Sequence, residues 1–480
     1  MVLNKPFNYA FIKHKSKDKM INELKRLLTG GGDERITITE KGTNKYHLNP
    51  VEYSDLLNRG SCTSGSLNQE TFNLIEKVNP QQYEANFEQE VNNHAQDLKD
   101  LFNLNGDPCF EVFFAPSGSD LVYYPLLFNR LLYPDKDPVN ILTCPEELGS
   151  GSQVAAHGRY YSQFNQFGKQ LEMDSLISKN INPDVKLLPA RNKLGYISDN
   201  HSNLVDLIKT NSPLPKIVNL VYGSKSGIEE SLHTIDEFIR PDIMWTVDLC
   251  QFRNKKVLIN DLLSKGVILL ITGSKFYQSP PFCGALLVPK DWCNRLADCD
   301  PGPADDFTNI FTKYDFPECL PNIRNRFHDF KNVGLHLRWK CALYEMKELD
   351  KIGEEGTYST ILNWNKEMMK AIDKSDYLEP MPDMDLTNKS IISFRVKNGE
   401  HYFDNTELKS LFINVVTAKH GKIKGHDKIF IGQPVKYDSG SFIRLAIGSY
   451  TVRQYIKTQN NDYKDDLEII RIIENEAKKR

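Results

Sequence analysis

One stretch of the chain places a lysine between two apolar runs: Ile271-Thr-Gly-Ser-Lys275-Phe-Tyr-Gln-Ser-Pro-Pro-Phe-Cys-Gly284. The flanking runs are Val267 to Ile271 and Ala285 to Val288. Lysine side chains are rarely buried unless they are paired or reactive. Burial favours the neutral amine, which is the form that reacts with a carbonyl group to give an imine. We therefore expect Lys275 to be a reactive amine, and the alternative is an ordinary lysine on a surface loop.

A carboxylate precedes this lysine at the end of another apolar run. The run Ile243 to Val247 leads into Val247-Asp-Leu-Cys-Gln251. Asp248 is placed to pair with the protonated nitrogen of a bound pyridinium ring, because an opposite charge favours the ionised form against desolvation. Gln251 could donate to a phenolic oxygen on the same ring. The alternative is an aspartate that caps a loop after a strand.

A turn of small residues comes earlier in the chain. Ala115-Pro-Ser-Gly-Ser-Asp120 follows the apolar run Val112-Phe-Phe and opens a helical stretch. Backbone N–H groups and hydroxyls at the positive end of a helix dipole suit a phosphate dianion. The alternative is a capping box formed by Ser117 and Asp120.

Short apolar runs alternate with helical stretches through the middle of the chain. Their length and their Val, Ile and Phe content are typical of buried parallel strands in an α/β layer architecture. A chain of 480 residues also exceeds the roughly 250 to 300 residues at which one core stops growing. We predict an N-terminal arm over residues 1–78, a large domain over 79–330 and a smaller C-terminal α+β domain over 331–480. The runs are Glu111 to Phe114, Val139 to Thr143, Ile217 to Tyr222, Ile243 to Val247, Val267 to Ile271 and Gly284 to Val288.

The pattern changes after residue 330. Leu335 to Asp350 predicts a long amphipathic helix that opens the second domain. Three later segments, Ile391 to Val396, Leu411 to Thr417 and Phe442 to Ile447, are predicted as strands, and a charged helix is expected after Val452.

Composition excludes several classes of function. Hydrophobic residues make up 40% of the chain and charged residues 26%, as in an ordinary globular protein. A net charge of −3 without a basic stripe argues against nucleic-acid binding. No apolar run is long enough for a membrane span or a signal peptide, so we expect a cytoplasmic protein. The nine cysteines lack the paired spacing of a metal site or a disulfide framework and are expected to be reduced thiols.

The three motifs together resemble the fold-type-I pyridoxal-phosphate enzymes, and within them the class V aminotransferase and cysteine desulfurase branch. The resemblance covers residues 111–289 approximately and rests on the order of the phosphate-type turn, the strand-end Asp-x-x-Gln and the lysine. It implies a large domain with a mixed, mostly parallel sheet between helices. It also implies pyridoxal 5′-phosphate as cofactor, with a Schiff base on Lys275. By this resemblance, the phosphate would be held by Ser117, Gly118, Ser119 and Thr272. The ring nitrogen would pair with Asp248, the ring face would pack on Cys250, and the phenolic oxygen would contact Gln251.

The resemblance extends to the small domain. Gly432-Gln-Pro-Val435 followed by Phe442-Ile-Arg-Leu445 looks like the segment that supplies a substrate-binding arginine in this branch. Alternation along that strand places Phe442, Arg444 and Ala446 on one face, away from the aliphatic one. Arg444 is thus the implied anchor of the substrate carboxylate, and Arg395 is the competing candidate.

Two positions depart from the branch. Desulfurases carry paired histidines where this chain has Cys144-Pro-Glu-Glu-Leu-Gly-Ser-Gly151, so Glu147, Leu148 or the nearby His157 is left to stack on the ring. An asparagine that the family often places before a Thr-Gly pair is missing from Tyr222-Gly-Ser-Lys-Ser-Gly227. Ser224 or Lys225 could replace it, although we expect Lys225 to be a solvated loop residue.

The resemblance implies an enzyme that acts on an amino acid, first of all an aminotransferase, and a homodimer. A lyase or a decarboxylating carbon–carbon bond enzyme on the same scaffold is the alternative. A degenerate homologue that acts as a partner protein is a third reading, which the intact Asp248 and Lys275 disfavour. Desulfurase activity needs a mobile, exposed cysteine, and neither Cys283 nor Cys319 is well placed for that role.

Overall fold

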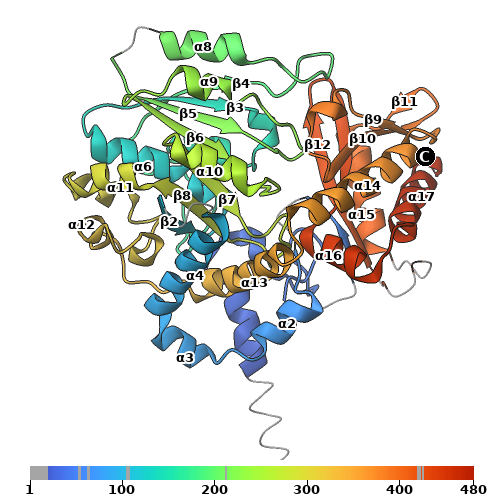
Figure 1. The fold of residues 1–480 in the computed structure, drawn as a ribbon, viewed down its shortest axis with the longest axis horizontal. Helices are drawn as coiled ribbons and strands as arrows, with labels where there is room; N and C mark the ends of the chain where they lie inside the picture. Colours follow the sequence, from blue (N-terminus) through green and yellow to red (C-terminus); the bar gives the residue numbers. More distant parts are fainter. Residues whose placement is uncertain are drawn as a thin grey trace, which may run out of the picture.

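The computed structural model describes residues 20–51, 56–61, 65–103, 109–210, 213–418, 423, 426 and 428–479. Cys62 lies outside these residues. Two β-sheets, each with its own helices, form the molecule (Figure 1). Within the described residues, no helix is both long and apolar enough to cross a bilayer.

The larger sheet has seven strands in the order β2-β8-β7-β6-β5-β3-β4. All six apolar runs of the large domain form strands of this sheet, which confirms them. One is not parallel as expected: β8 is antiparallel to both β2 and β7, so the sheet is mixed. A further strand, β4, was not predicted because four of its five residues are not buried and so leave no apolar run. The strands are β2 (Phe110–Ala115), β3 (Val139–Thr143), β4 (Asp184–Leu188), β5 (Lys216–Val221), β6 (Ile243–Asp248), β7 (Ile268–Thr272) and β8 (Gly284–Pro289).

Strand direction brings the predicted motifs to one edge of this sheet. Strands β3, β5, β6 and β7 are mutually parallel. Strand β2 has the same direction, because β8 runs antiparallel to both β2 and β7. Residues that follow the carboxyl ends of such strands meet in one crevice, which is where open α/β sheets bind ligands. Ser117, Glu147, Lys225, Asp248 and Lys275 all lie at or just beyond these ends.

The two faces of the large sheet are apolar and covered by helices. Alternation along β2 sends Val112 and Phe114 into one core cluster and Phe113 and Ala115 into the other. The first cluster includes side chains from α4 (Phe87–Phe102), α8 (His201–Lys209), α10 (Lys256–Ser264) and α13 (Val333–Asp350). The second includes α6 (Tyr123–Leu132), α7 (Ser152–Ala156) and α11 (Lys290–Ala297). Short helices complete this part: α2 (Gln69–Ile75), α3 (Pro80–Ala85), α5 (Gly118–Leu121), α9 (His233–Glu237) and α12 (Pro321–Arg324).

The smaller sheet has the strand order β1-β12-β13-β10-β11, with β9 paired to β10. Its β1 comes from the predicted N-terminal arm and pairs in parallel with β12, so this part of the arm is a strand of the sheet. The expected strands at 391–396 and 442–447 are confirmed as β10 and β13, and β12 was not predicted. The strands are β1 (Leu56–Arg59), β9 (Leu378–Pro380), β10 (Ile391–Asn398), β11 (His401–Tyr402), β12 (Lys428–Tyr437) and β13 (Gly440–Ala446).

The prediction of a strand at 411–417 is wrong, because this segment belongs to helix α15 (Asn405–Thr417). A capping box between Asp404 and Glu407 starts the helix. Its buried residues recur at helical spacing: Leu408, Leu411, Phe412, Val415 and Val416. The expected helix at 335–350 is confirmed as α13, and the expected C-terminal helix is two helices. The remaining helices here are α14 (Glu354–Ile372), α16 (Ser449–Thr458) and α17 (Lys464–Lys478).

A pair of buried histidines joins α4 to α13. The Nδ1 atoms of His94 and His336 are 3.2 Å apart, so one ring donates and the other accepts. Burial, and then the charge of nearby Arg338, lowers the pKa of His336 to about 3. Burial also places the pKa of His94 well below its ordinary value, with His336, Lys340 and Lys347 acting in the same direction. Both rings are therefore neutral at physiological pH.

We expect this pair to make the fold acid-sensitive. An unfolded histidine takes up a proton near pH 6.5 and these two do not, so the folded state binds fewer protons and loses stability as the pH falls below that value. The loss is about 1.4 kcal/mol per pH unit for each histidine. In urea unfolding between pH 6 and pH 5, where most of the unfolded histidine is protonated, His336→Phe should reduce the pH slope by about that amount. His157→Gln, at an exposed histidine, is the control, and an unchanged slope in His336→Phe contradicts the expectation.

Candidate active site

Lys275 and Asp248 both lie close enough to Cys250, at the carboxyl edge of the large sheet, for their charges to act on its thiol. Asp248 ends β6, and its Oδ1 accepts a hydrogen bond of 2.8 Å from the Cys250 backbone N–H. Burial and the charge of Asp248 raise the pKa of the Cys250 thiol, and the opposite charge of Lys275 acts against this rise. Thr272, which ends β7, donates its hydroxyl to the Cys250 carbonyl at 2.7 Å. The structure thus brings the acid, the cysteine, the threonine and the lysine into one cluster.

The small-residue turn after β2 packs directly on this cluster. A Cβ added to Gly118 would lie 2.9 Å from Cys250 Sγ and 3.4 Å from Thr272 Cγ2, so only a glycine fits here. Ser117 is the N-cap of α5, and the N–H groups of Gly118 and Ser119 open this helix without an acceptor inside it. The donors that this turn offers a phosphate group are therefore its backbone N–H groups, since the hydroxyls of Ser117 and Thr272 donate to Asp120 and to the Cys250 carbonyl.

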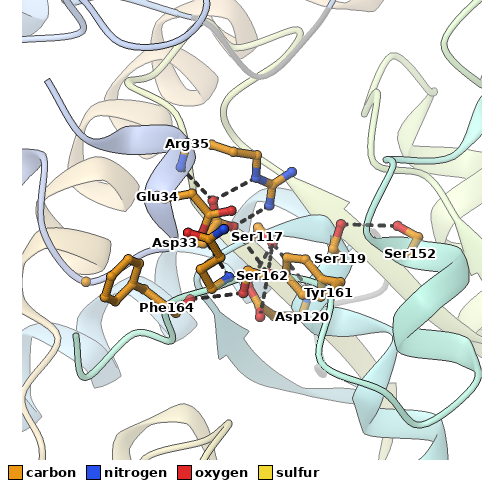
Figure 2. A network of polar contacts seen from close by, with 12 residues as sticks. Asp33, Glu34, Arg35, Ser117, Ser119, Asp120, Ser152, Tyr161, Ser162 and Phe164 are labelled. Atoms are coloured by element: carbon orange, nitrogen blue, oxygen red, sulfur yellow. Dashed lines mark hydrogen bonds and ion pairs between the residues drawn. The ribbon is translucent and has the colours of Figure 1, made fainter. Parts of the chain in front are cut away.

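A polar network joins this turn, through Tyr161, to Asp33 of the N-terminal segment (Figure 2). Ser117 Oγ donates to Asp120 Oδ2 at 2.7 Å, and Tyr161 Oη donates to Asp120 Oδ1 at 2.8 Å. Burial, with the negative charge of Asp33 nearby, raises the pKa of Asp120 to about 6. Arg35 pairs with Asp33 and lies over the Tyr161 ring. Of the capping box expected as the alternative, only the cap by Ser117 forms, because the Asp120 carboxylate accepts from the Ser117 hydroxyl and not from its backbone N–H.

The side chain of Gln251 is held by protein partners. Its Nε2 donates to the Ser61 carbonyl at 2.9 Å, and its Oε1 accepts from Arg253 Nε at 3.2 Å. Arg253 was not predicted, since nothing in the sequence distinguishes it from the neighbouring Lys255 and Lys256. Burial and the charge of Arg444 lower the pKa of Arg253 to about 9. Arg253 therefore links the Asp-x-x-Gln motif to Arg444 of the smaller sheet and to Ile447, which follows that strand.

Glu147, one of the three candidates for the residue that stacks on the ring, is buried and held by several hydrogen bonds. It accepts from Ser226 N at 2.7 Å, from Ser226 Oγ at 2.6 Å and from Ser224 Oγ at 2.8 Å. Tyr437, on β12 of the smaller sheet, also donates to it. Burial alone would raise the pKa of this carboxyl, but these hydrogen bonds hold it below its usual range. The Glu147 carboxylate therefore connects the turn after β5 to β12 of the smaller sheet.

Of the two other stacking candidates, His157 does not fit. Its side chain is exposed, and its Nδ1 lies 2.8 Å from the Gln153 carbonyl at the end of α7. Leu148 is buried within the second core cluster of the large sheet.

Lys225 belongs to the cluster, so the expectation of a solvated loop residue is wrong. It is partly buried in the turn after β5, and its Nζ donates to the Glu146 carbonyl at 3.2 Å. Burial, and then the positive charges of Arg444 and Lys275, lower its pKa to about 8, against the opposing charges of Glu147 and Asp248. Lys225 therefore has a large neutral fraction near pH 8, and its charged form interacts with the charge of Lys275.

Arg444 reaches the cluster from the smaller sheet. Its residue is only 2% exposed, and its charge acts on both Lys225 and Arg253. The Gly432 position opposite it on β12 makes room for the side chain, because a Cβ there would lie 2.8 Å from Arg444 Cγ and 2.9 Å from its Nε. This contact is the physical reason for a glycine in the Gly432-Gln-Pro segment.

Arg395 lies elsewhere on the smaller sheet. Its Nη1 is 3.9 Å from Glu379 Oε1, and its guanidinium lies over the Tyr402 ring. Its Nη2 approaches Gly195, outside the cluster around Lys275. Of the two predicted arginines, the structure brings only Arg444 to the candidate site.

Comparison with solved structures agrees with this fold. Ureidoglycine–glyoxylate aminotransferase from Bacillus subtilis matches at a TM-score of 0.57 and 13% identity, over 88% of this chain and 93% of that one. Alanine–glyoxylate aminotransferase from Nostoc sp. matches at 0.55 and 13%, over 85% and 96%. A glutamate decarboxylase domain from Vibrio parahaemolyticus matches at 0.53 and 13%, over 99% and 98%. No protein-family model and no curated protein matches the sequence. The chain has the fold of the fold-type-I transferases, as expected.

Proposed function

We propose that this protein is a pyridoxal-phosphate-dependent enzyme that acts on an amino acid, as an aminotransferase. The observation that carries the proposal is the convergence of Lys275, Asp248 and the Gly118 turn on Cys250 at one edge of the sheet. These groups fit the cofactor chemically. A primary amine, a carboxylate and a cradle of hydroxyls and N–H groups are what its aldehyde, its ring nitrogen and its phosphate respectively need.

Each part of the cluster has a proposed task. Ser117, Gly118, Ser119 and Thr272 would hold the phosphate, and Arg35 would offset the acids beside that turn. Asp248 would hold a proton on the ring nitrogen, and Cys250 would pack against the ring. When bound, the cofactor supplies an electron sink for a bond at the α-carbon of the substrate. Lys275 Nζ would hold the cofactor covalently and then move a proton at that α-carbon.

The remaining cations would orient the substrate. Arg444 presents a planar fork for the α-carboxylate, from a position where it is shielded from water. Lys225, with its pKa of about 8, would hold or release a proton beside Lys275. Glu147 would hold the turn containing Lys225 in place against the loop after β3, because it accepts hydrogen bonds from both serines that flank this lysine.

The proposal is tested by adding pyridoxal phosphate to the purified protein and recording visible absorbance, followed by a screen of amino acids with products identified by mass. A keto acid formed without loss of carbon dioxide supports transamination. Release of carbon dioxide supports the decarboxylating alternative, and failure to bind the cofactor rejects the proposal. Light scattering on the same sample tests the proposed homodimer.

We expect Arg444→Lys to raise KM for the amino acid by about 100-fold, because an ammonium cannot reproduce the bidentate contact with a carboxylate. Cofactor binding by the resting protein should be unchanged. Arg395→Lys is the matched control on a neighbouring strand and should leave KM within about twofold. A silent Arg444→Lys with a crippled Arg395→Lys would assign the anchor to Arg395.

A further inference from the structure

Two cysteines lie together at the edge of the large sheet opposite the candidate active site. Cys293 is on α11, which follows the carboxyl end of β8, and Cys319 is in the turn before α12. Because β8 runs antiparallel to β2 and β7, its carboxyl end lies at the amino ends of those strands. The two thiols are hydrogen-bonded to each other. Neither has a task in the proposed reaction, so that proposal leaves the pair unexplained.

Helix α4 and strand β2 bring these two cysteines together. Asn92 Nδ2 of α4 donates to Glu318 Oε1, in the same turn as Cys319, at 2.8 Å. Further along the helix, Lys99 Nζ pairs with Glu111 of β2 at 2.6 Å. Strand β2 in turn pairs with β8 up to the residue before α11. The contact between the thiols is therefore set by elements that are attached to one another, and not by a chance approach of two loops.

The two thiols differ in exposure and in acidity. Cys319 is exposed to solvent, whereas Cys293 is only 4% exposed. The hydrogen bond that Cys293 donates lowers the pKa of the Cys319 thiol, with the positive charge of Lys99 acting in the same direction against desolvation and Glu111. The same hydrogen bond, together with burial, raises the pKa of the Cys293 thiol. An accessible thiolate with a second cysteine beside it is the arrangement found at redox-sensitive cysteines.

We propose that Cys319 and Cys293 form a reversible thiol–disulfide pair that reacts with low-molecular-weight disulfides such as oxidised glutathione. The Cys319 thiolate attacks one sulfur of the reagent, releases one thiolate and retains the other half as a mixed disulfide. Cys293 then gives its proton to the released thiolate and attacks the Cys319 sulfur. The second half of the reagent leaves as a thiolate and takes a proton from water. In total, the two protein thiols lose two electrons and two protons, and the reagent gains them as two thiols.

The test uses the full-length protein, which is first reduced and then equilibrated in buffers with increasing ratios of oxidised to reduced glutathione. Peptide mass spectrometry without reduction should show Cys293 linked to Cys319 within one chain, with the loss of two hydrogen atoms. Excess reduced glutathione should restore both thiols. Cys109, exposed just before the amino end of β2, is the internal reference. In a brief exposure to iodoacetamide at pH 7, Cys319 should be labelled at least about tenfold faster than Cys109.

Three variants separate the two steps of the reaction. Cys293→Ser keeps a hydroxyl that can donate to Cys319 but cannot form the disulfide, so the mixed disulfide with glutathione should accumulate on Cys319. Cys319→Ser changes an exposed side chain and should lose both products, whereas Cys109→Ser should form the linked peptide as the unmodified protein does.

Three outcomes would overturn the proposal. They are the absence of the linked peptide at every glutathione ratio, a disulfide that joins two chains, and glutathione spread equally over Cys109 and Cys319. None of these measurements involves the cofactor, so the result is independent of the proposed function.

Discussion

Lys275→Ala is expected to abolish covalent attachment of the cofactor and to lower turnover by at least about 10⁴-fold, or roughly 5.5 kcal/mol of transition-state stabilisation. Both effects have one origin, since the same Nζ would hold the cofactor and move the proton at the α-carbon. Borohydride treatment of the unmodified protein should fix the mass of the cofactor on the peptide that contains Lys275. The measurement is peptide mass spectrometry together with steady-state kinetics.

Lys225→Met is the matched control for this expectation. Lys225 acts electrostatically on Lys275 and is partly buried, so a general effect of removing a buried amine from this crevice would appear in both variants. The fixed mass should remain on Lys275 in Lys225→Met. An adduct found on Lys225, or near-normal turnover in Lys275→Ala, would overturn the assignment.

The parts of the site that could be predicted from the sequence are those that follow strand ends. Apolar runs predict the strands β2, β6 and β7. Because these strands are parallel, the polar residues just beyond them lie at one edge of the sheet. The common location of Ser117, Asp248 and Lys275 could be predicted in this way. Their proximity needed no knowledge of side-chain contacts.

Contacts that depend on how the two sheets dock could not be read from the sequence. Arg253 contacts the smaller sheet only because β13 places Arg444, and the residue after the strand, Ile447, beside it. Glu147 follows β3 of the larger sheet, and Tyr437 ends β12 of the smaller one. No local pattern in either segment indicates that they are partners.

The errors in the predicted secondary structure have local causes. Residues 411–417 are rich in apolar and β-branched side chains, a composition that favours a strand. The evidence for a helix is the helical spacing of buried residues that begins at Leu408 and the capping box before it. Strand β12 was missed because its register shifts between Gly432 and Val435, where glycine and proline interrupt the apolar run. The same irregularity makes room for Arg444, so the feature that hid the strand serves the candidate site.

Asp248→Asn is expected to keep cofactor binding and to lower turnover by about three orders of magnitude, or roughly 4 kcal/mol. The amide is nearly isosteric, and its Oδ1 can still accept the 2.8 Å bond from Cys250 N, so the local backbone should be preserved. What disappears is the negative charge that would keep a proton on the ring nitrogen and so sustain the electron sink.

The control for this substitution is Asp242→Asn, just before the amino end of the same strand. Asp242 is exposed and pairs with Arg240 at 2.9 Å, and surface pairs of this kind contribute little. Turnover in Asp242→Asn should stay within about twofold of normal, since the site is at the opposite end of β6. Both variants should retain visible absorbance with added pyridoxal phosphate. If Asp248→Asn retained normal turnover, the ring nitrogen would not need this carboxylate, and the acid would serve only to cap the turn that positions Cys250.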